Sequence, residues 1–208
     1  MEKTEIKLDY LQNKKTFQSI VKKHIKRNVI DEIMSFLEET DFYRAPASSR
    51  FHLACPGGLC QHSMNVYKRL IKEYQHEYNY ATIQDIPEEK METIAIVSLF
   101  HDICKANFYE ESTRNVKKDG VWIQVPFYMV NEQLPMGHGE KSVFLLMKHM
   151  KLSDEEITAI NGHMGFSDDR VRGGNYSIVN VWEQYPLGLL LHVADIKATK
   201  IDEVEMEN

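Results

Sequence analysis

Cysteine is scarce in this sequence. Cys55, Cys60 and Cys104 are the only three in 208 residues. Their number is odd, and their spacing matches neither a disulfide framework nor a zinc finger. We therefore expect three buried thiols in a protein of a reducing compartment, including Cys60, although it lies close to His62 in the sequence.

Long hydrophobic runs are also lacking. Apolar stretches are interrupted within about a dozen residues, whereas a helix that spans a bilayer needs about 20. The opening residues, MEKTEIKLDY, do not contain the apolar core of a secretory signal. The sequence therefore predicts a cytoplasmic protein with no membrane partner.

Positive charge is not in excess. The chain has 25 Lys and Arg residues against 31 Asp and Glu residues, a formal net charge of −6. Duplex-DNA binding depends on neutralising phosphates, so this balance argues against duplex DNA as a partner. The segment KKTFQSIVKKHIKR (14–27) is locally basic, with Phe17, Val21 and Ile25 at helical spacing opposite the lysines. We interpret these lysines as a solvated helix face; a short track for single-stranded nucleic acid is the alternative.

Repeats, low-complexity tracts and linkers long enough to separate domains are absent. A chain of 208 residues can bury one sizeable core. Helical patterns dominate: TIAIVSLFHDICK continues a helix that opens at Pro87 and is apolar on all sides, which predicts a central position. Ser153 and Glu156 form a capping-box pattern, and a last long helix opens near Pro186.

One stretch breaks the helical pattern. In RNVKKDGVWIQVPFYMV (114–130), β-prone residues flank Asp119-Gly120, which is a strong hairpin signal. The predicted fold class is therefore all-α, a helical bundle with one small β-hairpin insertion.

Histidine and aspartate recur in five fragments. Each has an ordinary explanation when taken singly, such as a core histidine with one hydrogen-bond partner. His101, Asp102 and Asp195, however, lie in the most hydrophobic predicted helices, where an unpaired carboxylate costs several kcal/mol. A divalent metal would satisfy both carboxylates and recruit the histidines, as helical bundles do in their metal sites. The fragments are His62 in GLCQHS, His101-Asp102 in LFHDICK, His138 in PMGHGEKS, His163 in INGHMG and Asp195 in LHVADIKA.

This order of residues resembles that of the HD superfamily of metal-dependent phosphohydrolases. The blocks GGLCQHS, LFHDICK, GHGEKS, HMG and YPLGLLLHVADIKA are similar to those of a bacterial and phage-associated HD subfamily. They are also similar to the HD domain of certain bacterial 3′–5′ exoribonucleases. The resemblance covers about residues 51–200. It implies an HD domain over residues 51–203, with residues 1–50 as N-terminal helices packed on its core.

The resemblance also implies a set of metal ligands. The simplest members of the family hold one metal, and members with two further histidines generally hold two. His138 and His163 occupy those two places, so the resemblance implies a dinuclear site bridged by Asp102. Some relatives have a histidine pair where this chain has His163-Met164, which leaves the ligand count unchanged. The implied ligands are His62, His101, Asp102, His138, His163 and Asp195, and the pattern does not distinguish Fe, Mn, Mg, Ni or Zn.

The reaction that the resemblance implies is hydrolysis of a phosphomonoester or phosphodiester by metal-activated water. The expected partner is a nucleotide or a short single-stranded nucleic acid. Asp102 and Lys105 are the implied catalytic residues, with Lys105 binding phosphate and stabilising the transition state; alternatively, Lys105 only offsets a helix dipole. His52 and Lys141 are further candidates for substrate binding, with a loop histidine and an exposed helix lysine as the alternatives.

Two other functions share this ligand order. A few HD-superfamily members, of the inositol oxygenase type, hold two irons and activate oxygen. A nucleotide-sensing HD domain without turnover is the third interpretation. Sequence spacing does not separate the three, and it leaves the oligomeric state open.

Overall fold

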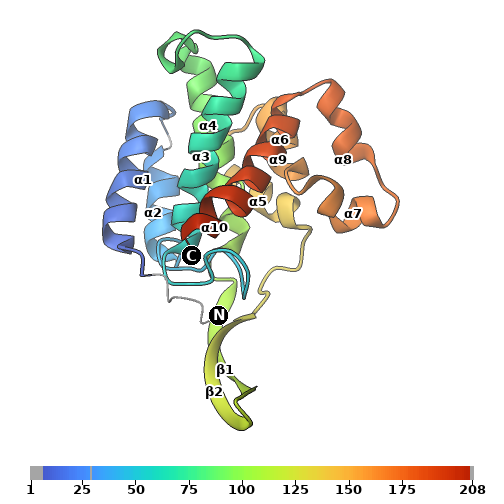
Figure 1. Cartoon of the computed structure of the whole chain (residues 1–208). Helices are drawn as coiled ribbons and strands as arrows, with labels where there is room; N and C mark the ends of the chain where they lie inside the picture. The colour runs from blue at the N-terminus through green and yellow to red at the C-terminus, as the bar shows by residue number, and fades with distance from the viewer. Residues whose placement is uncertain (1–6, 29, 207–208) are drawn as a thin grey trace.

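A computed structural model describes residues 7–28 and 30–206. Over this part of the chain the fold is mostly helical, with one two-stranded antiparallel sheet (Figure 1). The longer elements are α1 (Tyr10–His24), α2 (Ile30–Glu39), α3 (Gly58–Glu77), α4 (Glu88–Phe100), β1 (Tyr109–Lys118), β2 (Val121–Val130), α5 (His138–Met147), α6 (Asp154–Gly162) and α9 (Leu187–Lys197). The shorter elements are η1 (Ile83–Asp85), η2 (Ile103–Lys105), η3 (Gly165–Ser167), α7 (Asp169–Arg172), α8 (Ser177–Asn180), η4 (Val181–Glu183), the π-helical η5 (Ala198–Asp202) and α10 (Glu203–Met206).

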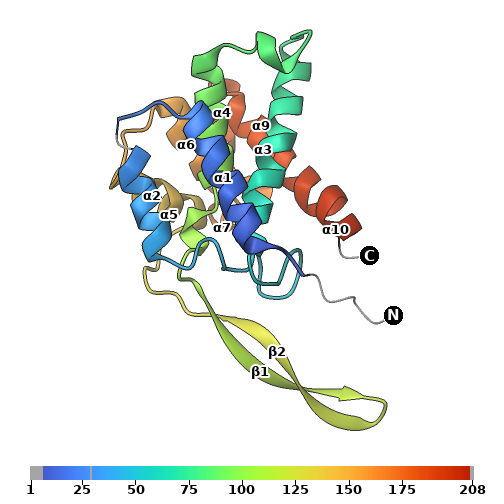
Figure 2. The same cartoon turned by 90° about the vertical axis from the view of Figure 1, so that its left-hand side faces the viewer.

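Helix α4 lies at the centre of the bundle, as its sequence predicts. All its residues from Ile94 to Phe100 are buried, because α1, α3 and α6 pack around it (Figures 1 and 2). The prediction that this helix continues through residue 105 is wrong. The α-helix ends at Phe100, and His101 and Asp102 form a turn before η2. The two polar side chains therefore lie just beyond the helix end, where backbone and side-chain partners are available to them.

Helices α1 and α2 share the core of the rest of the chain. Phe17 and Val21 of α1 are fully buried, and the Phe17 ring packs edge-on against Phe42 and Phe100, with centroids 5.2 and 5.8 Å away. The buried side chains of α1 and α2 belong to the same core cluster as those of α3, α4 and α9. Lys22 and Lys23 are exposed, as expected for a solvated face.

The glycine pair before α3 is required by the backbone. Gly57 has a φ of +82°, a conformation that L-residues rarely adopt. A Cβ on Gly58 would lie 2.0 Å from the Leu53 carbonyl oxygen. The Leu53 carbonyl therefore lies so close to Gly58 that no side chain fits at this position. Helix α3 starts at Gly58, four residues before His62.

The hairpin is confirmed. Strands β1 and β2 pair from Tyr109↔Val130 to Lys118↔Val121, and the turn between them uses positive φ at Asp119 (49°) and Gly120 (83°). Two positive φ values in a two-residue loop are typical of a type I′ turn. Figure 2 shows the ribbon extending away from the helical body.

The capping box before α6 is also confirmed, with the Ser153 hydroxyl accepting from the Glu156 backbone N–H and the Glu156 carboxylate accepting from that of Ser153. Within the described residues, no helix combines the length and the apolar character that a bilayer crossing needs.

Candidate metal centre

The six predicted ligands converge in space from five parts of the fold. Asp102 and the imidazoles of His62, His101 and His163 are buried, whereas His138 and Asp195 are partly buried. Among the described residues, four groups of three histidine, aspartate, glutamate or cysteine side chains bring their ligand atoms within 4.8 Å of one another here. The positions are α3 for His62, the turn after α4 for His101 and Asp102, the first residue of α5 for His138, the end of α6 for His163, and α9 for Asp195.

Asp102 lies at the centre of this group. Its Oδ2 is 3.5 Å from Nε2 of His62 and 3.5 Å from Nε2 of His101. Its Oδ1 is 2.7 Å from Nε2 of His138 and 3.6 Å from Nε2 of His163. The two oxygens of one carboxylate therefore divide four imidazole nitrogens into two pairs.

The pair around Oδ2 has the spacing of a coordination shell. Nε2 of His62 is 3.3 Å from Nε2 of His101 and 3.2 Å from Oδ1 of Asp195. Ligand atoms bound about 2.1 Å from one cation are separated by about 3.0–3.4 Å, depending on whether the geometry is octahedral or tetrahedral. The residues present therefore fit a divalent metal.

Backbone carbonyls orient two of the imidazoles. Nδ1 of His101 donates to the Ser98 carbonyl (2.8 Å), and Nδ1 of His163 donates to the Ile160 carbonyl (2.6 Å). A carbonyl oxygen can only accept, so Nδ1 carries a proton in both rings and Nε2 is the nitrogen that faces the cluster. Nε2 of His163 is buried without a hydrogen-bond partner among the described residues. The carbonyl of His163 in turn accepts from Nδ1 of His192 at 2.7 Å.

Sequence reasoning missed Glu203, the most buried carboxylate near the site. Its Oε1 accepts from Nδ1 of His62 at 2.8 Å and from the Asn65 side-chain amide at 3.2 Å. A carboxylate behind a histidine fixes the ring orientation and raises its basicity as a ligand. The available signal was the spacing: Asp195, Thr199 and Glu203 follow one another at four-residue intervals.

Charges of both signs meet in the cluster. The carboxylates of Asp102, Asp195 and Glu203 face the imidazole of His62 and the ammonium of Lys105, whose Nζ lies 2.7 Å from Asp102 Oδ2. Burial alone lowers the pKa of His62, but Glu203 and Asp195 outweigh burial and raise it to about 10. Burial lowers the pKa of His101 to about 3, against the opposing effect of Asp102, so its ring is neutral at pH 7. The carboxylates therefore favour positive charge at this site, which the proton on His62 or a bound cation would supply.

A cavity of about 470 Å³ opens onto the cluster. The predicted substrate residues Lys105 and His52 both line it, together with His62, Asp102 and Asp195. Nε2 of His52 is 4.0 Å from Glu203, and burial, together with the nearby His62, lowers the pKa of His52 to about 4. The structure thus brings Lys105 and His52 to the site.

Lys141 lies elsewhere. It lines an adjoining cavity of about 250 Å³ that shares His138 with the first. Its ammonium pairs with Glu132 at 2.6 Å and lies over the Phe108 ring, and the residue is buried rather than exposed. Cys104, one of the expected buried thiols, contacts Nδ1 of His138 at 3.4 Å.

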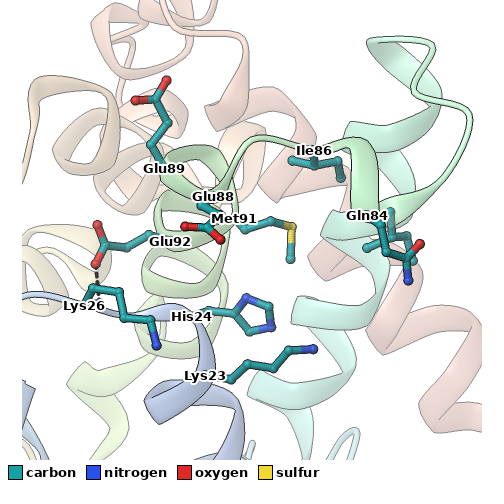
Figure 3. A pocket seen from close by; sticks show the side chains of 10 residues that line it. Lys23, His24, Lys26, Gln84, Ile86, Glu88, Glu89, Met91 and Glu92 are labelled. Carbon is teal, nitrogen blue, oxygen red and sulfur yellow. Dashed lines mark hydrogen bonds between the residues drawn. The ribbon is translucent and has the colours of Figure 1, made fainter.

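A further cavity, of about 460 Å³, lies between the end of α1 and the start of α4, lined by none of the predicted site residues (Figure 3). Lys23 and Lys26 line it together with Glu88 and Glu92, so charges of both signs surround an apolar floor. Nothing in this arrangement selects a ligand.

The chain has no match among protein-family models, curated proteins or solved structures. The fold and the site geometry by themselves define a mostly helical protein with a buried His/Asp/Cys cluster that can hold a metal ion. The family and the reaction remain predictions.

Proposed function

We propose that this protein is a metal-dependent phosphohydrolase of the HD type, acting on a nucleotide or a short single-stranded oligonucleotide. The observation that supports this most directly is the position of Asp102. Its two oxygens each face a different pair of imidazole nitrogens, which is the arrangement that a carboxylate bridging two cations requires.

The residues would divide between two cations. His62, His101 and Asp195 would hold one on the Oδ2 side of Asp102. His138 and His163 would hold the other on the Oδ1 side. Glu203 and the Ser98 and Ile160 carbonyls keep three of the rings in place from behind.

Divalent cations at such a site lower the pKa of bound water and neutralise charge on phosphoryl oxygens. Lys105 adds a fixed positive charge from the protein itself. Its ammonium lines the cavity, and although burial opposes the charged form, Asp102 raises its pKa, so it stays protonated. From that position it binds a phosphate oxygen and stabilises the charge that develops there. A cation on the cavity wall favours an anionic substrate.

The experiment is metal analysis and hydrolysis on the same preparations. Protein purified without chelator is assayed for bound metal by elemental analysis, then with Mn²⁺ or Fe²⁺ against a panel of nucleoside monophosphates and short oligonucleotides. Asp102→Asn should lose both metal and activity. The control is Asp202→Asn, because Asp202 pairs with Arg69 outside the cluster and its loss should leave metal and activity in place.

Two outcomes contradict the proposal. One is a protein that binds metal but hydrolyses no phosphoester on the panel; oxygen consumption by the iron-loaded form would then point to the oxygenase reaction. The other is an Asp102→Asn variant that retains wild-type metal content and turnover.

A further inference from the structure

The cavity above the cluster has a mouth whose chemistry differs from its floor. The floor consists of carboxylates and imidazoles. The walls nearer the solvent include three apolar side chains, Phe51, Met164 and Ile196. Phe51 precedes α3, Met164 follows α6 and Ile196 belongs to α9, so three separate segments contribute to one apolar rim.

Two residues of this apolar rim are exposed. Phe51 has 61% of its surface exposed and Ile196 has 46%, whereas Met164 is partly buried. The backbone N–H of Phe51 donates to the Ser48 hydroxyl at 2.8 Å, and the Arg50 guanidinium lies over the ring, 5.1 Å from its centroid. The Phe51 ring thus lines the cavity with Arg50 over one of its faces.

Polar groups at the same rim are an ammonium and two hydroxyls. Lys200 follows Ile196 by one helical turn, is exposed, and has no carboxylate partner among the described residues. The hydroxyls of Ser167 and Thr199 complete the lining. A flat aromatic group would find a matching apolar surface here, with the polar groups of Lys200, Ser167 and Thr199 beside it.

We propose that this rim is a base-binding subsite, so that the substrate is a nucleoside phosphate with its base against Phe51 and its phosphate toward Lys105. This inference rests on the proposed function and narrows its substrate class. A cavity of about 470 Å³ has the size of sites for one small organic ligand. It therefore accepts a single nucleotide, either free or at the end of a strand.

The test compares Phe51→Ala with a matched control on two substrates. The control is Phe144→Ala, because Phe144 is also exposed (40%) and also carries a cation over its ring, Lys148 at 4.4 Å, but lies outside the cavity lining. The substrates are adenosine monophosphate, which has a base, and glycerol phosphate, which does not. Each variant is assayed for kcat and KM with both.

Loss of one stacked base predicts a KM for adenosine monophosphate about 5- to 150-fold higher in Phe51→Ala. The kcat/KM for glycerol phosphate should not change, Phe144→Ala should behave as wild type, and Phe51→Trp should restore the low KM. Equal effects of Phe51→Ala on both substrates, or none on either, overturn the subsite.

Binding separates this inference from the proposed reaction. If the wild type hydrolyses neither phosphomonoester, titration calorimetry with adenosine monophosphate still tests the subsite, and the proposed reaction is judged on the full panel of nucleotides and oligonucleotides. The subsite then requires wild-type binding that Phe51→Ala weakens by the same 5- to 150-fold factor. No binding by the wild type, or equal binding by both proteins, overturns it.

Discussion

Replacing Glu203 with glutamine tests whether this carboxylate strengthens His62 as a metal ligand or only stabilises the fold. Glu203 is fully buried, and its Oε1 lies 2.8 Å from Nδ1 of His62. Glutamine keeps the shape and one acceptor oxygen but removes the charge that makes the His62 ring a stronger ligand. Loss of such a supporting carboxylate typically weakens metal binding about 10- to 100-fold.

The expected size follows from mass action. A metal present at 100 times its Kd stabilises the wild type by about 2.7 kcal/mol. For a protein of this size, that raises Tm by about 5–11 °C. At the same metal concentration, a site that binds metal 10- to 100-fold more weakly stabilises the variant by only about 0.4–1.4 kcal/mol, which raises its Tm by about 1–6 °C. The assay is thermal unfolding with and without Mn²⁺, with Kd measured by calorimetry.

Glu156→Gln is the matched control. Glu156 is equally buried, but it pairs with Arg27 and caps α6, away from the cluster. This change should lower Tm by the same amount with and without metal, leaving the metal-induced shift at its wild-type value. The reasoning is refuted if Glu203→Gln retains the wild-type Kd and shift, or if Glu156→Gln reduces the shift as much.

Two further changes probe catalysis and folding. Lys105→Met should lower kcat about 10²- to 10³-fold, as loss of one transition-state donor does, while elemental analysis finds the wild-type metal content; loss of metal would show that Lys105 is structural instead. Gly58→Ala should destabilise the protein by more than about 3 kcal/mol in urea unfolding, because its Cβ would lie 2.0 Å from the Leu53 carbonyl oxygen. A Cβ on Gly120 would meet no atom within 4 Å, so Gly120→Ala should lower the free energy of unfolding only through the strain of a left-handed φ, by about 1–2 kcal/mol. Equal losses of stability in Gly58→Ala and Gly120→Ala would contradict the steric argument.

Local sequence patterns predicted the secondary structure where the deciding interactions are themselves local. The Asp119-Gly120 turn and the Ser153–Glu156 capping box were both confirmed, because φ preferences and short side-chain-to-backbone hydrogen bonds act within a few residues. The end of α4 was predicted too late. Helical periodicity continues past Phe100, and only the surrounding partners of His101 and Asp102 decide that the helix stops there.

The candidate site was predictable in part. The residue order predicted six side chains that the fold does bring together, since burial of Asp102 among apolar residues already required a partner. Glu203 was missed because its role depends on the ring nitrogen of His62, 141 residues earlier in the chain. Lys141 lines the adjoining cavity, where it pairs with Glu132, and its contact with substrate stays a prediction.

The sequence by itself therefore determined that the chain forms helices with one hairpin, because hydrophobic periodicity and turn chemistry encode those features directly. The six candidate ligands were implied by a family resemblance in the order of the histidines and aspartates. Only the tertiary structure decided which oxygen of Asp102 faces which pair of histidines, that Glu203 supports His62, and that an exposed Phe51 borders the same cavity. Such relations are set by how α3, α4, α6 and α9 pack together, and distances between side chains far apart in the chain are a property of packing rather than of spacing.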